Sequence, residues 1–337
     1  MQIGGQAVIE GVMMRAPGRV ATAVRRLDGN ILVKRQPHTP LTERHRFLRW
    51  PVLRGAVGLV DMLSLGISAL NFSADIAAQD AHTAGSKNDG GGNSPAPRRR
   101  SQTRAMLALT LIVALALGVG LFFVVPLLAA TYLFDVEQTA LAFNLTAGVV
   151  RISILLAYLG LISLMPDIRR LFCYHGAEHK SIFAFELNRP LTVDSARGRS
   201  RFHPRCGTSF LLIVMVAAIL AFSVLDALLL EVCGELTIWQ RLVTHLPLIP
   251  LIGGVSYEAI KFSARHSGTR WGRMLVAPGL WLQTITTKEP DDAQLEVALV
   301  ALRSALGQEE AVTTESGILP GCSAVVRYAE ATASEVG

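Results

Sequence analysis

Long runs of apolar residues dominate the middle of this chain. Four of these runs carry few charges and reach the roughly 20 residues that an α-helix needs to cross a bilayer. They predict transmembrane helices at residues 106–134, 142–165, 209–230 and 242–262. We therefore expect a mainly α, polytopic membrane protein with a four-helix membrane domain that covers residues 106–262.

A further apolar segment covers residues 52–76 and reads VLRGAVGLVDMLSLGISALNFSADI. Arg54 and Asp61 interrupt it, and a crossing here would carry the ten basic residues from Arg15 to Arg54 to the outer side. That placement opposes the rule that basic residues stay on the cytoplasmic side. We predict an amphipathic helix over residues 51–76 that lies on, or dips into, the inner face of the membrane.

The N-terminal residues alternate in a way that is typical of strands. The run VATAVRRLDGNILVKRQ has two strand-like halves around Asp28 and Gly29, and this dipeptide is a strong hairpin signal. Residues 1–50 are therefore predicted to form a small cytoplasmic β unit.

The remaining segments are polar or short. Residues 77–105 are rich in Gly, Ser, Asn and Pro and contain the basic triplet 98–100, which predicts a flexible basic linker. Residues 263–307 are predicted to form cytoplasmic or interfacial helices, with a packing face at helical spacing made by Leu295, Leu299, Leu302 and Leu306. The acidic residues 308–337 are predicted to form a disordered tail.

Composition supports the membrane assignment. Of the 337 residues, 51% are hydrophobic and 17% are charged, whereas soluble domains carry about 25% charge. This composition argues against a large soluble enzyme and against a disordered protein. The four cysteines are irregularly spaced and contain no CxxC pair, which argues against a disulfide scaffold and against a zinc ribbon.

The basic residues predict the orientation of the chain. Fifteen of the 32 lysines and arginines precede residue 106 and eight lie within 166–208, while residues 135–145 contain none. This alternation places both termini and the loop 166–208 in the cytoplasm, in a multi-pass protein of the inner membrane. We expect no secretory signal peptide. We also expect the net charge of +6 to set the membrane topology and to favour contact with the lipid bilayer, and not to bind nucleic acid.

The strongest chemical signal is the sequence HGAEH at residues 175–179. On a helix, His175 and His179 project from one face, so both imidazoles can reach one metal ion. Glu178 lies beside them, where a carboxylate can act as a general base toward water, as in the inverted zincins. The alternative is a polar helix end in which these side chains satisfy one another or lipid phosphates.

Three residues are candidates for a third ligand. His203 and Cys206 lie on the same side of the predicted membrane domain, and Glu258 lies near the cytoplasmic end of the fourth predicted span. Two of them have a structural alternative, because Cys206 can be a small buried residue and Glu258 can pair with Lys261 on its own helix. The sequence leaves the choice among the three open.

Two further charged residues lie within the predicted spans. Arg151 and Asp226 lie at similar depths when they are counted from the cytoplasmic ends of their helices. A structural ion pair or snorkelling near the outer face explains them better than a transport site. His245, near the outer end of the fourth span, has no partner at ligand spacing.

Several motifs together resemble a known family. They are GGQAVIEGVMMRAP at residues 4–17, SALNFSA, YHGAEHK at 174–180, HPRCGTSF at 203–210 and PGLWLQTITTKEP at 278–290. In these motifs the chain resembles the bacterial YqhQ-like membrane proteins, described as a domain of unknown function and as predicted metal-dependent enzymes. The resemblance extends from Gly4 to about Leu306. It implies a membrane protein in which His175, Glu178, His179, His203 and Cys206 form one constellation.

The sequence thus predicts a cytoplasm-facing site for a divalent metal, with Zn²⁺ as the favoured ion. Its ligands would be His175 and His179 with His203, Cys206 or Glu258, and Glu178 would be the catalytic residue of a metal-dependent hydrolase. A site at the membrane face favours a membrane-protein or lipid-linked substrate. The alternative is a non-catalytic membrane scaffold or assembly factor with a structural metal or His cluster. The sequence indicates no oligomeric state.

Overall fold

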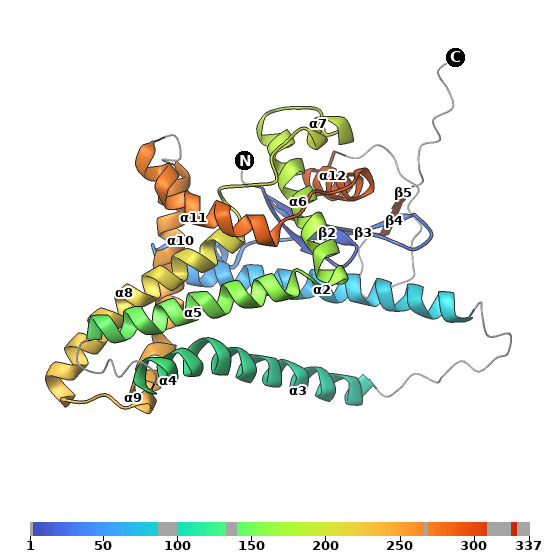
Figure 1. Cartoon of the computed structure of the whole chain (residues 1–337). Coiled ribbons are helices and arrows are strands. Elements are labelled where there is room, and N and C mark those ends of the chain that lie inside the picture. The colour runs from blue at the N-terminus through green and yellow to red at the C-terminus, as the bar shows by residue number, and fades with distance from the viewer. Residues whose placement is uncertain (1–2, 87–99, 133–139, 266–268, 309–324, 329–337) are drawn as a thin grey trace, which may run out of the picture.

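A small β-sheet and a set of long apolar helices make up the chain (Figure 1). The computed structural model describes residues 3–86, 100–132, 140–265, 269–308 and 325–328. Its strands are β1 (Gly4–Val8), β2 (Gly11–Ala16), β3 (Arg19–Arg25), β4 (Ile31–Pro37) and β5 (Val325–Tyr328). The helices of the first half are α1 (Leu41–Arg44), the 3₁₀-helix η1 (Arg46–Arg49), α2 (Leu53–Ser86), α3 (Arg100–Val119), the π-helix η2 (Gly120–Val124), α4 (Val125–Tyr132) and α5 (Ala140–Ile162).

The second half is helical up to residue 306. Its elements are α6 (Pro166–Glu186), α7 (Val193–Arg197), α8 (Gly207–Cys233), α9 (Ile238–His245), the 3₁₀-helix η3 (Leu246–Leu248), α10 (Ile249–Arg265), α11 (Arg270–Thr286) and α12 (Asp292–Leu306). The segment predicted as the loop 166–208 is therefore largely helical, because α6 and α7 occupy most of it.

The sheet is a meander of antiparallel strands in the order β1-β2-β3-β4-β5. The predicted hairpin at Asp28 and Gly29 joins β3 to β4, with Arg25 paired to Ile31 and Gly29 in the left-handed region at a φ of +85°. The pattern at residues 20–36 did not indicate β1 and β2. It also gave no sign of β5, a strand from the segment predicted as a disordered tail, which pairs with β4.

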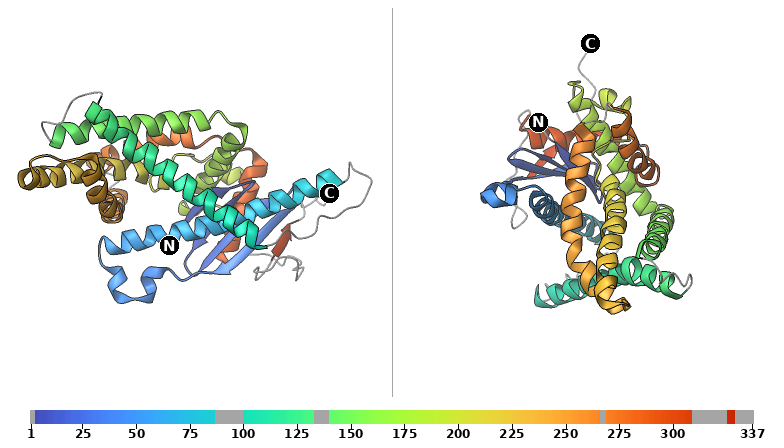
Figure 2. Two further views of the ribbon diagram at one scale, coloured as in Figure 1. Left: turned by 90° about the horizontal axis from the view of Figure 1, so that it is seen from below. Right: turned by 90° about the vertical axis from the view of Figure 1, so that its left-hand side faces the viewer.

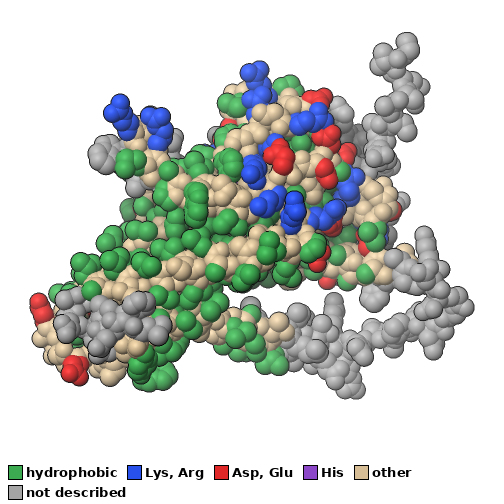
Figure 3. Space-filling model, in the orientation of Figure 1, with side chains coloured by type: hydrophobic (Ala, Val, Ile, Leu, Met, Phe, Trp, Pro, Cys, Tyr) green, Lys and Arg blue, Asp and Glu red, His purple; other side chains and the backbone are tan. Residues whose placement is uncertain are grey.

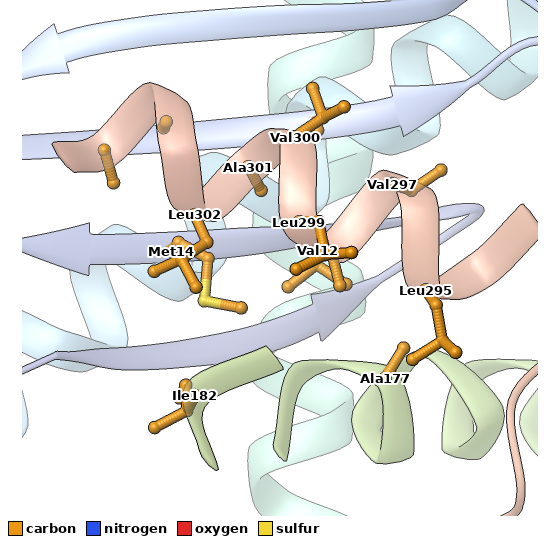
Figure 4. Close-up of a cluster of buried hydrophobic side chains, with 14 of the residues drawn as sticks. Val12, Met14, Ala177, Ile182, Leu295, Val297, Leu299, Val300, Ala301 and Leu302 are labelled. Carbon is orange, nitrogen blue, oxygen red and sulfur yellow. The ribbon is translucent and has the colours of Figure 1, made fainter. Parts of the chain in front are cut away.

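Both faces of the sheet are buried, because successive residues of β2 point to opposite sides. Val12 and Met14 pack with α6 and α12, whereas Met13 packs with α2. On the first side, α12 lays Leu295, Leu299 and Leu302 across the strands, as Figure 4 shows. The packing face predicted on this helix is therefore the centre of the largest core. We call β1–β5 together with α6, α7 and α12 the sheet layer.

Helix α2 covers the other face of the sheet and is longer than predicted. Leu65, Ala69, Phe72 and Ile76 pack against the strands, and the helix runs along them in the views of Figure 2. It continues to Ser86, into the segment predicted as a linker. The residues after Ile76 are rich in alanine, a strong helix former. Residues 87–99 lie outside the described part of the chain.

Five described helical segments are long and apolar enough to cross a membrane, one more than the four predicted. The additional one is Leu53–Ala81 within α2. The other four are Ile112–Tyr132, Ala140–Ile162, Gly207–Cys233 and Ile238–Phe262. Hydrophobic side chains cover the outer surface of α5 and α8, while lysine and arginine gather over the sheet layer (Figure 3). A multi-pass protein with these helices would contact the lipid bilayer through that apolar surface.

A buried polar cluster joins three of the apolar helices. Asp226 of α8 accepts hydrogen bonds from Asn144 of α5, at 2.7 Å, and from Arg241 of α9. Its other carboxylate oxygen lies 2.9 Å from Nε2 of His245, and all four side chains are buried. Asp226 and Arg151 therefore do not form the ion pair that was one of the two explanations expected for them. Arg151 instead donates to the carbonyl of Phe122, 2.7 Å away, in the π-helical turn η2.

Candidate metal centre

Helix α6 carries the two histidines of the HGAEH sequence on one buried face. It begins at Pro166, which is well suited to the first turn because its missing N–H would have no partner there, and Asp167 complements the helix dipole. His175 and His179 follow one turn apart, with ring centroids separated by 4.5 Å. The predicted common face of the two imidazoles is thus present in the folded chain.

Cys206 completes a group of three possible metal ligands. It is the residue that precedes α8, and its Sγ lies 3.2 Å from Nε2 of His175. One nitrogen from each of His175 and His179 and the sulfur of Cys206 all lie within 4.8 Å of one another. Ligand atoms around a tetrahedral Zn²⁺ are separated by about 3.5 Å, given Zn–N and Zn–S bonds near 2.1 and 2.3 Å. The three side chains are therefore close to the spacing that one ion requires.

Backbone carbonyls set the orientation of both imidazoles. Nδ1 of His175 donates to the carbonyl of Thr286 at 2.9 Å, and Nδ1 of His179 donates to the carbonyl of Arg201 at 2.5 Å. A carbonyl can only accept, so Nδ1 carries the proton and Nε2 carries the lone pair. In metal sites the second ring nitrogen of a histidine ligand is held in this way. Burial also lowers the pKa of His179, which favours the neutral form that can bind a cation.

Glu178 lies in the interior beside this group. One of its carboxylate oxygens is 3.9 Å from Nε2 of His175, and the backbone N–H of Gly5 in β1 donates to it. Burial raises the pKa of Glu178, although the nearby His175 and His203 oppose the change. A Cβ at position 5 would lie 2.8 Å from Cγ and from Oε1 of Glu178, so the glycine permits this approach.

The end of α11 and the segment after it support the cluster. The backbone N–H of Lys288 donates to the carbonyl of Phe172 at 2.9 Å, and a Cβ at Gly176 would overlap the carbonyl of Lys288. Gln283 makes two hydrogen bonds of 2.8 Å with the backbone of His203, and its amide also donates to Ser209. Sequence reasoning assigned no role to Gln283, Gly5 or Gly176, since nothing in their spacing indicates contacts with segments so distant in the chain.

The other two ligand candidates have different partners. His203 lies beside the cluster, with its ring centroid 5.6 Å from that of His179, but its Nε2 lies 3.4 Å from Glu186 and its Nδ1 accepts from the backbone of Arg205. Glu258 is not brought to the cluster. Arg54 of α2 binds its carboxylate through two hydrogen bonds of 2.6 and 2.5 Å. Cys206 is thus the one of the three that the fold places against both histidines.

Comparison with known proteins agrees with the resemblance in the motifs. The profile of a family described as "Protein of unknown function (DUF1385)" matches residues 50–308. The uncharacterized protein YqhQ of Bacillus subtilis (strain 168) is 31% identical over 318 residues, which cover 91% of this chain and 92% of that protein. No solved structure matches the chain. The chain therefore belongs to the DUF1385 family of YqhQ-like proteins, whose function is unknown.

Proposed function

We propose that this protein is a multi-pass membrane protein that binds one divalent metal ion, Zn²⁺ by the chemistry of its ligands, through His175, His179 and Cys206. The orientation of the two imidazoles carries the proposal. Each Nδ1 is occupied by a backbone carbonyl, and the Nε2 of His175 is directed at the cysteine sulfur. Two imidazoles and one thiol form a donor set that zinc favours over magnesium or calcium.

The number of ligands favours catalysis. Catalytic zinc sites have three protein ligands and one open position, whereas structural sites close with four. Three donors gather here among the described residues, and the carboxylate of Glu178 lies beside them. When bound, the ion would supply Lewis acidity toward water or a substrate carbonyl, and Glu178 would hold and transfer the proton. We infer a hydrolase at the cytoplasmic face of the inner membrane, acting on a membrane-protein or lipid-linked substrate.

A second candidate function is a membrane scaffold with a structural ion. The donors come from α6 and from the start of α8. The carbonyl that orients His175 belongs to Thr286, the last residue of α11. An ion here would therefore cross-link the sheet layer to two neighbouring helices. His179 and Cys206 are also buried, which suits a closed site.

Cobalt substitution tests the metal site directly. Detergent-solubilised protein loaded with Co²⁺ should show the thiolate-to-cobalt charge-transfer band in the near ultraviolet. Cys206→Ser should lose this band and bind zinc about 100-fold more weakly or worse, since the loss of outer contacts alone costs about 10- to 100-fold. Cys173→Ser is the matched control, because Cys173 lies on α6 outside the donor group. Equal bands in wild type and Cys206→Ser, or none in wild type, would refute the site.

The variant Glu178→Gln separates catalysis from scaffolding. Glutamine keeps the shape and can still accept from the N–H of Gly5, so fold and metal content should remain at wild-type levels. If the protein is a hydrolase, the variant should fail to complement a deletion strain in which the wild-type gene restores growth or envelope integrity. Full complementation with bound metal would instead support the scaffold.

A further inference from the structure

A cavity of about 550 Å³ lies on the opposite side of the sheet from the metal centre, where the chain enters α2. Its walls come from β2, α1, η1, α2 and α10, so it opens between the first strands and two of the apolar helices. The side chains that define its chemistry are Arg15, Arg49, Arg54, Lys261, Glu43 and Asp61. None of them belongs to the metal centre.

Four basic side chains line this cavity, Arg15, Arg49, Arg54 and Lys261, against the two carboxylates of Glu43 and Asp61. Arg54 is committed to Glu258, and Asp61 lies 3.1 Å from Nε2 of His38 and 3.9 Å from Arg15. Within the described part of the chain, Arg49 donates to two backbone carbonyls, of Thr42 and Glu43, at 3.3 and 3.4 Å. Lys261 lies one helical turn after Glu258, whose carboxylate Arg54 already binds, and Arg15 contacts the thioether sulfur of Met62 at 2.8 Å. Arg15, Arg49 and Lys261 can therefore turn toward an added anion.

Exposed apolar side chains surround the cavity. Phe47 and Trp50, beside Arg49, are 56% and 66% exposed, and Phe262, beside Lys261, is 60% exposed. Tryptophan, whose ring is apolar but carries an N–H donor, is typical of the membrane interface, and Trp50 is such a residue. A site for a free anion would not require this apolar rim, whereas a lipid offers a charged headgroup and acyl chains together.

The contact between α2 and α10 gives the cavity a fixed floor. A Cβ at Gly55 would lie 2.9 Å from Cα of Gly254, and one at Gly254 would overlap the carbonyl of Val52. The two backbones therefore touch, and the pair Arg54–Glu258 closes the same junction. This contact fixes the backbones of the two helices, and so the positions from which the Arg54 and Lys261 side chains extend.

We propose that this cavity binds the phosphate of an anionic phospholipid headgroup, with Arg15, Arg49 and Lys261 as its cationic contacts. Arginine and lysine are the usual partners of phosphate, and basic pockets at helix ends bind such headgroups. The acyl chains would lie along the exposed apolar faces of α2 and α10. The site is independent of the metal centre and of the activity proposed for it.

Binding of labelled phosphatidylglycerol to the full-length protein in detergent tests this site. The double variant Arg15→Gln, Lys261→Gln should weaken binding at least about tenfold, since hydrogen bonds to charged groups are the strong ones. Arg270→Gln, Arg273→Gln is the matched control, because it removes the same charge from exposed positions outside the cavity. The control should bind within about twofold of wild type. Equal weakening in both double variants would show diffuse attraction and overturn the proposal.

Two further measurements keep the test decisive. Arg49→Gln alone removes an exposed side chain that donates to two backbone carbonyls, so it should fold normally and still weaken lipid binding. Phosphatidylcholine and inorganic phosphate serve as competitors, and neither should displace phosphatidylglycerol efficiently. Displacement by inorganic phosphate at equal concentration would identify a free-phosphate site, and displacement by phosphatidylcholine would show that the anion is not recognised. Either result would refute the proposal.

Discussion

Replacement of both His175 and His179 by alanine is expected to reduce bound zinc from about one ion per chain to background. The two imidazoles are two of the three donors within 4.8 Å, and Cys206 alone cannot retain the ion. Loss of outer contacts to a ligand costs about 10- to 100-fold in affinity, so loss of two ligands should cost on the order of 10⁴-fold. Metal analysis of protein purified without chelators, followed by competition with a chromogenic chelator, measures the change.

His203→Ala provides the sharpest control for that experiment. This side chain is a histidine in the same interior, yet its nitrogens face Glu186 and the backbone of Arg205 rather than the donor group. Metal content in His203→Ala should stay close to wild type. If this variant loses as much zinc as the double variant, then His203 is a ligand and the proposed three-donor site is incorrect.

Asp226→Ala should be the most destabilising single substitution among the apolar helices. The carboxylate faces Arg241, His245 and Asn144, and it is fully buried. Removing one partner of a buried ion pair typically costs about 3–5 kcal/mol, because the other charge loses its compensation in a low-dielectric interior. Unfolding of the purified protein in mixed micelles with increasing denaturing detergent should show this loss in the free energy of unfolding.

A compensating variant separates the ion pair from simple packing. Asp226→Leu combined with Arg241→Met replaces both charges by apolar groups, a change that is often neutral for buried pairs. The double variant should therefore regain part of the stability that Asp226→Ala loses, with the remainder reflecting Asn144 and His245, which lose their shared acceptor. A stability of Asp226→Ala within about 0.5 kcal/mol of wild type, the range usual for surface substitutions, would contradict the role assigned to this cluster.

Periodicity and turn chemistry predicted the local elements of this fold. The hairpin at Asp28 and Gly29, the buried face of α12 and the apolar helices all follow from patterns within short windows. The pairing of β5 with β4 joins segments almost 300 residues apart in sequence, and no local pattern encodes such a contact. Asp226 shows the same limit, because depth counting offered Arg151 as its partner while the fold supplied Arg241 from the following helix.

The metal centre was predictable to a similar degree. Helical spacing alone placed His175 and His179 on one face, and the same reasoning placed Glu178 beside them. The third donor depended on how the start of α8 meets α6, so Cys206, His203 and Glu258 could not be distinguished beforehand. The carbonyls that orient the rings belong to Thr286 and Arg201, and backbone groups carry no signature in a sequence.

The shared core of the sheet layer also restricts how the chain can thread a bilayer. Strands β1–β4, helix α6 and helix α12 pack together, so all three must occupy one side of any membrane in which the protein is embedded. Each stretch of chain that connects the strands to α6, or α6 to α12, must then cross the membrane an even number of times. The interval from α6 to α12 holds two candidate segments, in α8 and in α9–α10, and satisfies this parity.

The described residues between β4 and α6 hold three candidates, namely α2, the continuous α3–α4 segment and α5. An odd number cannot return the chain to its starting side, so one of the three stays out of the bilayer. Helix α2 is the one that lays Leu65, Phe72 and Ile76 on the sheet, which binds it to the same side as the strands. Among the described helices, parity is therefore met by four crossings with α2 along the surface, whereas hydropathy alone allows five.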